Sequence, residues 1–371
     1  MQSRSRARRR LAALASTLSL IVVACGGGAT ETTTATADTT PPDTSETTAA
    51  SAPSEEFTTE GLEIGQILYS SNPSQLAHAR HVEEYAAEMG ISVRTIDGQI
   101  DAQVQADAIA DLIAAGVDGI LFQPVDPAAA VGPIEQAQEA GIPIATWAIK
   151  PADEVTTPFL ELNEYETAYE GGVNAAEFVI ETFGDTPKVV AIDIPTVPLC
   201  SELRVQGFVD GVLSVASDAE IVSRPDGGGD REGGTNVMED IIQSGAEFNI
   251  VTACNGEMVL GALGALEAAG RGNATDKVPQ TEYIYTIDGT PPEIDELLDP
   301  SSPVMETMAL TPRENGRKFL DILVRMMAGE IGMTEPYVEI TQSQNLPPDC
   351  DVVTDVLVNE FFSEPPAACE G

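Results

Sequence analysis

The alternation of short apolar runs with amphipathic helical patterns most restricts how this chain can fold. Between the runs, apolar residues recur at helical spacing, as at Val104, Ala108 and Leu112. A repeat of strand and helix predicts parallel sheets covered by helices on both faces, so we expect an α/β fold. The apolar runs predict strands at 64–69, 93–96, 119–122, 142–146, 189–194, 221–223, 250–253, 283–287 and 304–310.

Ligands of such sheets bind beyond the carboxyl ends of the strands, where loops lead into helices. The segments that follow the strands are therefore the candidate binding loops. They are rich in Asn, Asp and Arg and include the only Trp, a set suited to hydroxyl groups and an apolar ring face. These segments are 69–72, 123–126, 147–150, 195–204, 255–257 and 288–291.

The N-terminus has the pattern of an export signal. Arginines at positions 4, 6, 8, 9 and 10 precede an uncharged apolar run at 11–23, which is shorter than the roughly 20 residues of a membrane span. The approach Val-Val-Ala to Cys25, followed by three glycines, resembles a bacterial lipoprotein signal. This predicts removal of 1–24 and a lipid anchor on Cys25. The alternative is an ordinary secretory signal with a chance cysteine.

Residues 25–60 consist mainly of Thr, Ser, Ala, Pro and acidic residues, which cannot bury a core, so we expect a disordered tether. The remaining residues exceed what one core usually serves, which predicts two lobes.

The charge of the chain argues against nucleic acid as a partner. It holds 60 acidic and 18 basic residues, a net charge of −42, and a polyanion repels nucleic acid and acidic membranes. The only histidines, His78 and His81, fall in the first helix, where we expect them to be exposed. Cysteine spacings fit no zinc pattern, so we expect neither metal nor cofactor.

Five motifs, in order, resemble the ribose-type periplasmic binding proteins of ABC importers across residues 61–345. The resemblance implies the periplasmic binding protein-like I fold: two doubly wound parallel-sheet lobes with ligand in the cleft between them. It implies an N-terminal lobe of 61–162 plus 311–338 and a C-terminal lobe of 163–310 plus 339–371. Crossovers are expected at 162–164, 309–311 and 338–341. The motifs are 116–121 (Gly-Val-Asp-Gly-Ile-Leu), 140–144 (Ala-Gly-Ile-Pro-Ile), 202–208 (Glu-Leu-Arg-Val-Gln-Gly-Phe), 255–263 (Asn-Gly-Glu-Met-Val-Leu-Gly-Ala-Leu) and 287–291 (Ile-Asp-Gly-Thr-Pro).

The resemblance also implies the ligand-binding residues, because an Arg donates, a carboxylate accepts, and an Asn does both toward hydroxyl groups. Two alternatives are that Asp288 merely caps a turn and that Arg204 lies on a helix surface. The implied ligand-binding residues are Asn72, Asn163, Glu164, Arg204, Asn255 and Asp288.

Departures from the family pattern put ribose itself in doubt. Ser74 and Gln75 stand where ribose binders have two aromatic residues, and Ala148 and Ile149 stand where they have an Asp-Arg pair after the fourth strand. Trp147 directly precedes the position of the Asp-Arg pair and is expected to supply a ring face in the cleft. The alternative is that Trp147 packs in a lobe core.

Four cysteines remain after Cys25, and an exported chain meets an oxidising compartment. In a flavodoxin-like strand order, the first and third strands of a lobe are neighbours. We therefore expect Cys200 to pair with Cys254, and Cys350 to pair with Cys369 in the tail.

The sequence thus predicts an extracytoplasmic, lipid-anchored, monomeric receptor that captures a sugar or polyol and delivers it to an ABC importer permease. The alternative is a receptor that presents a small polar ligand to a membrane sensor. An enzyme is not expected, because the chain has neither a Gly-x-Ser-x-Gly elbow nor a paired-carboxylate motif. A regulator of the LacI type would need a DNA-binding domain in place of the signal and tether.

Overall fold

The computed structural model describes residues 57–358, 360–361 and 364–369. The signal segment, Cys25 and nearly all of the tether lie outside these residues, so the lipid anchor stays a prediction. Within the described residues, every helix is too short or too polar to cross a bilayer.

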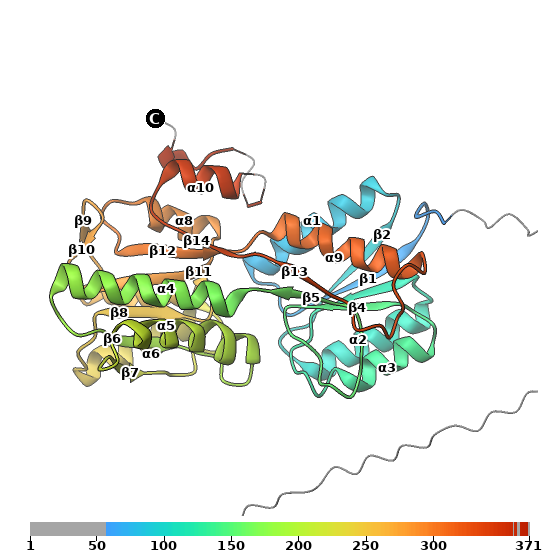
Figure 1. Cartoon of the computed structure of the whole chain (residues 1–371), viewed down its shortest axis with the longest axis horizontal. Coiled ribbons are helices and arrows are strands. Elements are labelled where there is room, and N and C mark those ends of the chain that lie inside the picture. Colours follow the sequence, from blue (N-terminus) through green and yellow to red (C-terminus); the bar gives the residue numbers. More distant parts are fainter. Residues whose placement is uncertain (1–56, 359, 362–363, 370–371) are drawn as a thin grey trace, which may run out of the picture. The chain divides into compact units, whose positions relative to one another are not determined.

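The first lobe is a six-stranded parallel sheet in the order β13-β5-β4-β3-β1-β2 (Figure 1). Helices α1 and α9 pack together on one face, and α2 and α3 on the other. β3 and β4 are buried along their whole length because both faces are covered. The elements are β1 (Glu63–Leu68), α1 (Pro73–Glu88), β2 (Ser92–Asp97), α2 (Ala102–Ala115), β3 (Gly119–Phe122), α3 (Val131–Glu139), β4 (Ile144–Trp147), β5 (Phe159–Leu162), α9 (Pro312–Met327) and β13 (Val338–Thr341).

The second lobe has a six-stranded sheet in the order β14-β12-β11-β8-β6-β7, parallel except for β14. Helices α4 and α5 pack together, as do α6 and α7. The helices are α4 (Glu164–Phe178), the π-helical turns η1 (Val179–Phe183) and η2 (Leu199–Val205), α5 (Gln206–Val215), α6 (Arg231–Ser244), α7 (Gly256–Ala268), α8 (Pro291–Leu298), α10 (Cys350–Leu357) and the 3₁₀ turn η3 (Ala367–Cys369). The strands are β6 (Lys188–Ile192), β7 (Glu220–Ser223), β8 (Ile250–Ala253), β11 (Tyr283–Asp288), β12 (Val304–Ala309), β14 (Gln344–Leu346) and a separate hairpin of β9 (Ala274–Thr275) and β10 (Val278–Pro279).

Glycines allow α4 and α5 to approach closely. A Cβ atom on Gly172 would overlap the carbonyl of Phe208, and one on Gly211 would overlap the carbonyl of Tyr169. Since η2 runs directly into α5, this packing brings the start of α4 beside η2. Two residues expected in the site, Glu164 and Arg204, lie on these segments.

The chain passes between the sheets three times: between β5 and α4, between β12 and α9, and between β13 and β14. The first two passages fall at the predicted crossovers. The third prediction, 338–341, is wrong, because this segment is β13 and pairs with β5 from Val338↔Phe159 to Thr341↔Leu162. The passage instead takes place over residues 342–343. The predicted α/β fold with parallel sheets is confirmed, whereas the predicted lobe limits stay a prediction.

The expectation that both histidines are exposed is also wrong. His78 is 1% exposed and His81 is 8% exposed. His78 stacks on Trp147, and the Nε2 atom of His81 lies 2.6 Å from the carbonyl oxygen of Glu360. Helix α9 packs on α1 but comes much later in the sequence. No local pattern in α1 therefore shows that its histidines are covered.

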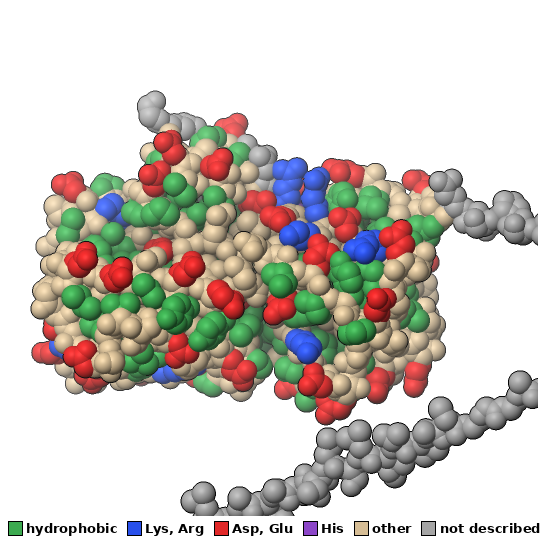
Figure 2. Space-filling model, in the orientation of Figure 1, with side chains coloured by type: hydrophobic (Ala, Val, Ile, Leu, Met, Phe, Trp, Pro, Cys, Tyr) green, Lys and Arg blue, Asp and Glu red, His purple; other side chains and the backbone are tan. Residues whose placement is uncertain are grey.

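Acidic side chains are numerous on the face of the molecule that Figure 2 shows. Figure 2 shows acidic side chains distributed over both lobes, with a smaller group of basic side chains on the first lobe near α1 and α9.

Candidate functional site

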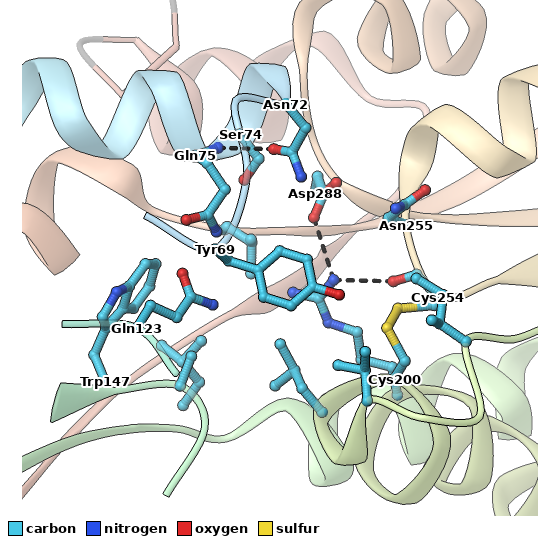
Figure 3. Close-up of a pocket in the computed structure, with 17 residues that line it drawn as sticks. Tyr69, Asn72, Ser74, Gln75, Gln123, Trp147, Cys200, Cys254, Asn255 and Asp288 are labelled. Carbon is cyan, nitrogen blue, oxygen red and sulfur yellow. Dashed lines mark hydrogen bonds and ion pairs between the residues drawn. A yellow bond between two sulfur atoms is a disulfide. The ribbon is translucent and has the colours of Figure 1, made fainter. Parts of the chain in front are cut away.

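A cavity lies between the carboxyl ends of the strands of the two lobes (Figure 3). Its volume is about 40 Å³. The first lobe and the crossover after β12 contribute Tyr69, Asn72, Ser74, Gln75, Gln123, Trp147, Ala148, Leu162 and Leu310. The second lobe contributes Ile194, Val197, Leu199, Cys200, Arg204, Cys254, Asn255 and Asp288.

Two of the expected site residues lie at the N-terminal ends of helices. Asn72 is the N-cap of α1, and its side-chain oxygen accepts a hydrogen bond of 2.9 Å from the amide of Gln75. Asn255 is the N-cap of α7 and accepts a hydrogen bond of the same length from Met258. Each side-chain oxygen already accepts one capping hydrogen bond, and the NH₂ groups of the two carboxamides can donate to a ligand. One N–H of Asn255 is already donated to the carbonyl of Gly229.

Arg204 is held by protein partners on several sides. Its Nε and Nη2 atoms donate to the two carboxylate oxygens of Glu164 at 2.9 and 2.7 Å, and Nη1 donates to the carbonyl of Cys254 at 2.9 Å. Nη1 also lies 3.5 Å from Oδ1 of Asp288. Burial alone would lower the pKa of Arg204, but the carboxylates of Glu164 and Asp288 outweigh it and raise that pKa. The guanidinium is therefore a fixed cation in the cavity wall.

Asp288 completes this charged wall. It has φ of +117°, a backbone conformation that side chains other than glycine rarely adopt, and it precedes Gly289 at φ +72°. Burial raises the pKa of Asp288 to about 6, although Arg204 opposes that rise. Within the described part of the chain, its carboxylate has only long contacts, to Arg204 and to the amide of Gly256 at 3.4 Å, so it can accept hydrogen bonds from a ligand.

Glu293 lies behind Asp288 and was not predicted. Its carboxylate accepts from the amide and the hydroxyl of Thr290 at 2.9 and 2.6 Å, and burial raises its pKa to about 8. The spacing Thr290-x-x-Glu293 is that of a capping box, so this contact could have been found in the sequence.

Asn163 and Glu164 do not line the cavity. Glu164 is fully buried and contacts Arg204 from behind. Asn163 accepts a hydrogen bond of 2.7 Å from the amide of Ser343, which joins the first and third crossovers. Their contact with ligand stays a prediction, and in this geometry they support Arg204 and the crossover region.

Trp147 combines the two alternatives considered for it. It lines the cavity but is only 4% exposed, and its ring stacks on His78 with centroids 4.0 Å apart and an angle of 9°. Phe319 lies against the same ring pair. Burial lowers the pKa of His78 to about 3, so this histidine packs as a neutral ring. One face of the indole is therefore committed to the lobe core.

Three polar side chains of the first lobe line the cavity and carry atoms without a hydrogen-bond partner. Among the described residues, the hydroxyl of Tyr69 and the side-chain oxygens of Gln75 and Gln123 are buried without a hydrogen-bond partner. In Figure 3 the ring of Tyr69 lies in the middle of the cavity. Burial raises the pKa of Tyr69 to about 12, so its hydroxyl stays protonated. These atoms require partners that a ligand can supply.

Both predicted disulfides are present in the structure. Cys200 and Cys254 have Cα atoms 5.0 Å apart, and those of Cys350 and Cys369 are 5.3 Å apart. Over the described ranges, no group of His, Cys, Asp and Glu has the arrangement of a metal site.

This fold and cavity define a two-lobed binding protein that encloses its ligand between parallel-sheet lobes. Residues 69–331 match the family described as periplasmic binding protein domain, and the chain belongs to that family. The ribose import binding protein of Bacillus subtilis strain 168 is 30% identical over 222 residues, which are 60% of this chain and 69% of that protein. The putative rhizopine-binding protein of Rhizobium meliloti is 30% identical over 193 residues, 51% of this chain and 62% of that protein.

Solved structures share the fold. A solute-binding protein of Bacillus halodurans C-125 with bound myo-inositol has a TM-score of 0.68 at 21% identity, covering 80% of this chain and 97% of that one. A Mycobacterium smegmatis protein in complex with β-D-fucofuranose has a TM-score of 0.68 at 22% identity, covering 80% and 94%. The resemblance drawn from the sequence motifs is thereby confirmed.

Proposed function

We propose that this protein captures a sugar or a related polyol between its lobes and delivers it to an ABC importer. The family and the ligands named for its relatives and structural neighbours support this proposal. The observation that carries it is the cavity wall, where fixed donors and acceptors of the second lobe face uncommitted polar atoms of the first. Hydroxyl groups can both donate to and accept from such a wall.

The charges of the wall favour a neutral ligand over an acid. Among the residues that the structure describes, Arg204 is the only cation that lines the cavity, and Glu164 already neutralises it through two hydrogen bonds. Asp288 then adds a further carboxylate beside the cavity. A ligand carboxylate or phosphate would lie near the Asp288 carboxylate, and among the described lining residues no unpaired cation would balance the negative charge of the ligand.

The cavity is too small for a sugar ring in the described geometry. A water needs roughly 10 to 15 Å³, so a volume of about 40 Å³ accommodates about three waters. We propose that the lobes part at the three crossovers to admit a ligand and close on it, as in other hinged binding proteins.

We further propose that Cys25 carries a lipid that keeps the receptor at the outer face of the cell membrane. The signal-like residues before Cys25 support this. Replacing Cys25 with serine should release the protein to the medium, and mass spectrometry of the N-terminal peptide should find acyl chains only in the wild type. Retention of the Cys25→Ser protein at the membrane would contradict the anchor.

A thermal-shift screen tests the capture function. The panel is D-ribose, D-galactose, L-arabinose, D-allose, myo-inositol and allitol, with D-glucuronate as the acid. A ligand at a hundredfold excess over its Kd should stabilise the protein by about 2.7 kcal/mol. We expect at least one neutral compound to raise the melting temperature, and no effect of glucuronate.

A matched pair of variants places the effect in the cavity. Gln123→Leu removes an unpaired cavity oxygen, whereas Gln103→Leu makes the same change at an exposed position of α2. Binding should weaken about tenfold in Gln123→Leu, the loss of one hydrogen bond, and stay unchanged in Gln103→Leu. A panel without any stabilising sugar or polyol would overturn the proposed function.

A further inference from the structure

The disulfide between Cys200 and Cys254 is part of the cavity wall. Both cysteines line the cavity and are almost fully buried, at 4% and 1% exposure. Figure 3 shows the bridge next to the Cys254 carbonyl that accepts a hydrogen bond from the guanidinium of Arg204. The bridge therefore lies at the ligand side of the lobe, away from its outer surface.

The bridge connects the two segments that present the polar residues of this lobe. Cys200 lies on the π-helical turn η2, which also carries Arg204 four residues further on. Cys254 follows β8 and immediately precedes Asn255, the N-cap of α7. The two half-cystines are 54 residues apart in sequence, so one covalent bond fixes Arg204 relative to Asn255.

The segment that carries Arg204 is irregular, and the disulfide constrains it. η2 is a seven-residue π-helical turn, and π-helical hydrogen bonding is rare and occurs mostly at functional sites. At its start, the amides of Cys200 and Ser201 both donate to the single carbonyl of Val197. Cys254, by contrast, is anchored to the sheet, since its amide donates to the carbonyl of Ile192 at 2.9 Å. The bridge thus fastens an irregular turn to a rigid strand end.

We propose that the Cys200–Cys254 disulfide is a positioning element of the binding site. It holds Arg204 and Asn255 in the arrangement that receives the ligand, and its sulfur atoms form part of the apolar wall. Binding sites gain affinity when their polar groups are held in place before the ligand arrives. This inference rests on the proposed capture function.

Reduction should uncouple these two residues. A dithiol such as dithiothreitol transfers two electrons and two protons to the bridge, which becomes two thiols while the reagent becomes a cyclic disulfide. The attacking thiolate must reach a sulfur atom that lies in the cavity wall. A sugar bound in the cavity should cover that atom and slow the reduction of the bridge.

The chain offers a matched control in its second disulfide. Cys350 and Cys369 are 19 residues apart and join the start of α10 to the tail turn η3. Neither residue lines the cavity between the lobes. Loss of this bridge also removes a covalent constraint, but it leaves η2 and β8 connected.

The test compares the wild type with the double variants Cys200→Ser/Cys254→Ser and Cys350→Ser/Cys369→Ser. Titration calorimetry with the sugar or polyol that gives the largest shift in the thermal screen measures affinity. We expect Kd to rise at least tenfold in the first variant and to stay within twofold in the second. Equal affinities of the wild type and the Cys200→Ser/Cys254→Ser protein would overturn the proposal.

Hydrogen exchange without any sugar separates this inference from the capture function. The amides of 199–206 and 255–258 should exchange at least tenfold faster in Cys200→Ser/Cys254→Ser, and at the wild-type rate in the control. Unchanged exchange rates at 199–206 and 255–258 in the Cys200→Ser/Cys254→Ser protein overturn the positioning role, even if none of the sugars binds. If Cys200→Ser/Cys254→Ser does not fold, the Cys350→Ser/Cys369→Ser protein before and after reduction with dithiothreitol gives the comparison, because Cys200–Cys254 is the bridge that remains in it.

Discussion

The ion pair between Arg204 and Glu164 allows a quantitative prediction. Glu164 is fully buried, and every hydrogen bond found for its carboxylate in the described structure comes from Arg204, at 2.7 and 2.9 Å. Arg204→Met keeps much of the volume of the side chain but removes both donors. A buried carboxylate is then left without its partner, which typically costs about 3 to 5 kcal/mol. We therefore expect the free energy of unfolding of Arg204→Met to be about 3 to 5 kcal/mol lower than that of the wild type at pH 7.

Urea unfolding followed by circular dichroism measures this difference in the free energy of unfolding. Arg80→Met is the matched control, because Arg80 pairs with Glu84 at 3.8 Å while both side chains are more than half exposed. An exposed pair of this kind contributes at most about 1 kcal/mol. The reasoning is refuted if Arg204→Met has the unfolding midpoint of the wild type.

Three further expectations concern other parts of the protein. Burial raises the pKa of Glu306 to about 7, so its contribution to stability is complete below about pH 4.5 and is lost as pH rises through 7. Glu306→Gln should therefore flatten the dependence of the free energy of unfolding on pH over this range, as measured by urea unfolding. An unchanged slope would disprove this. The emission of Trp147 should be blue-shifted in the folded protein and move to the red in urea, whereas native emission at the wavelength of exposed indole would contradict its packing on His78. Small-angle scattering should show a smaller radius of gyration at saturation with the sugar selected in the screen, and an identical radius would count against hinge closure.

Much of the fold could be predicted because its signals are local. Apolar runs mark the strands at 64–69 and 119–122, and apolar residues at helical spacing, as at Val104, Ala108 and Leu112, mark a helix. The pairing of Cys200 with Cys254 could be predicted because the first and third strands of a lobe are neighbours in this strand order, as β6 and β8 are. Each of these inferences needs only short-range sequence or a general rule of connection.

The tertiary structure decided which polar groups are free to meet a ligand. Arg204 was expected to offer its donors to a sugar, but the packing of α4 on η2 commits two of its nitrogen atoms to Glu164. His78 was expected in solvent, yet α9 covers it and Trp147 stacks on it. Composition and periodicity reveal which residue types lie near a strand end. Whether a side chain faces solvent, a partner or the cavity depends on segments that are at least 40 residues away in the sequence, and only their packing settles that.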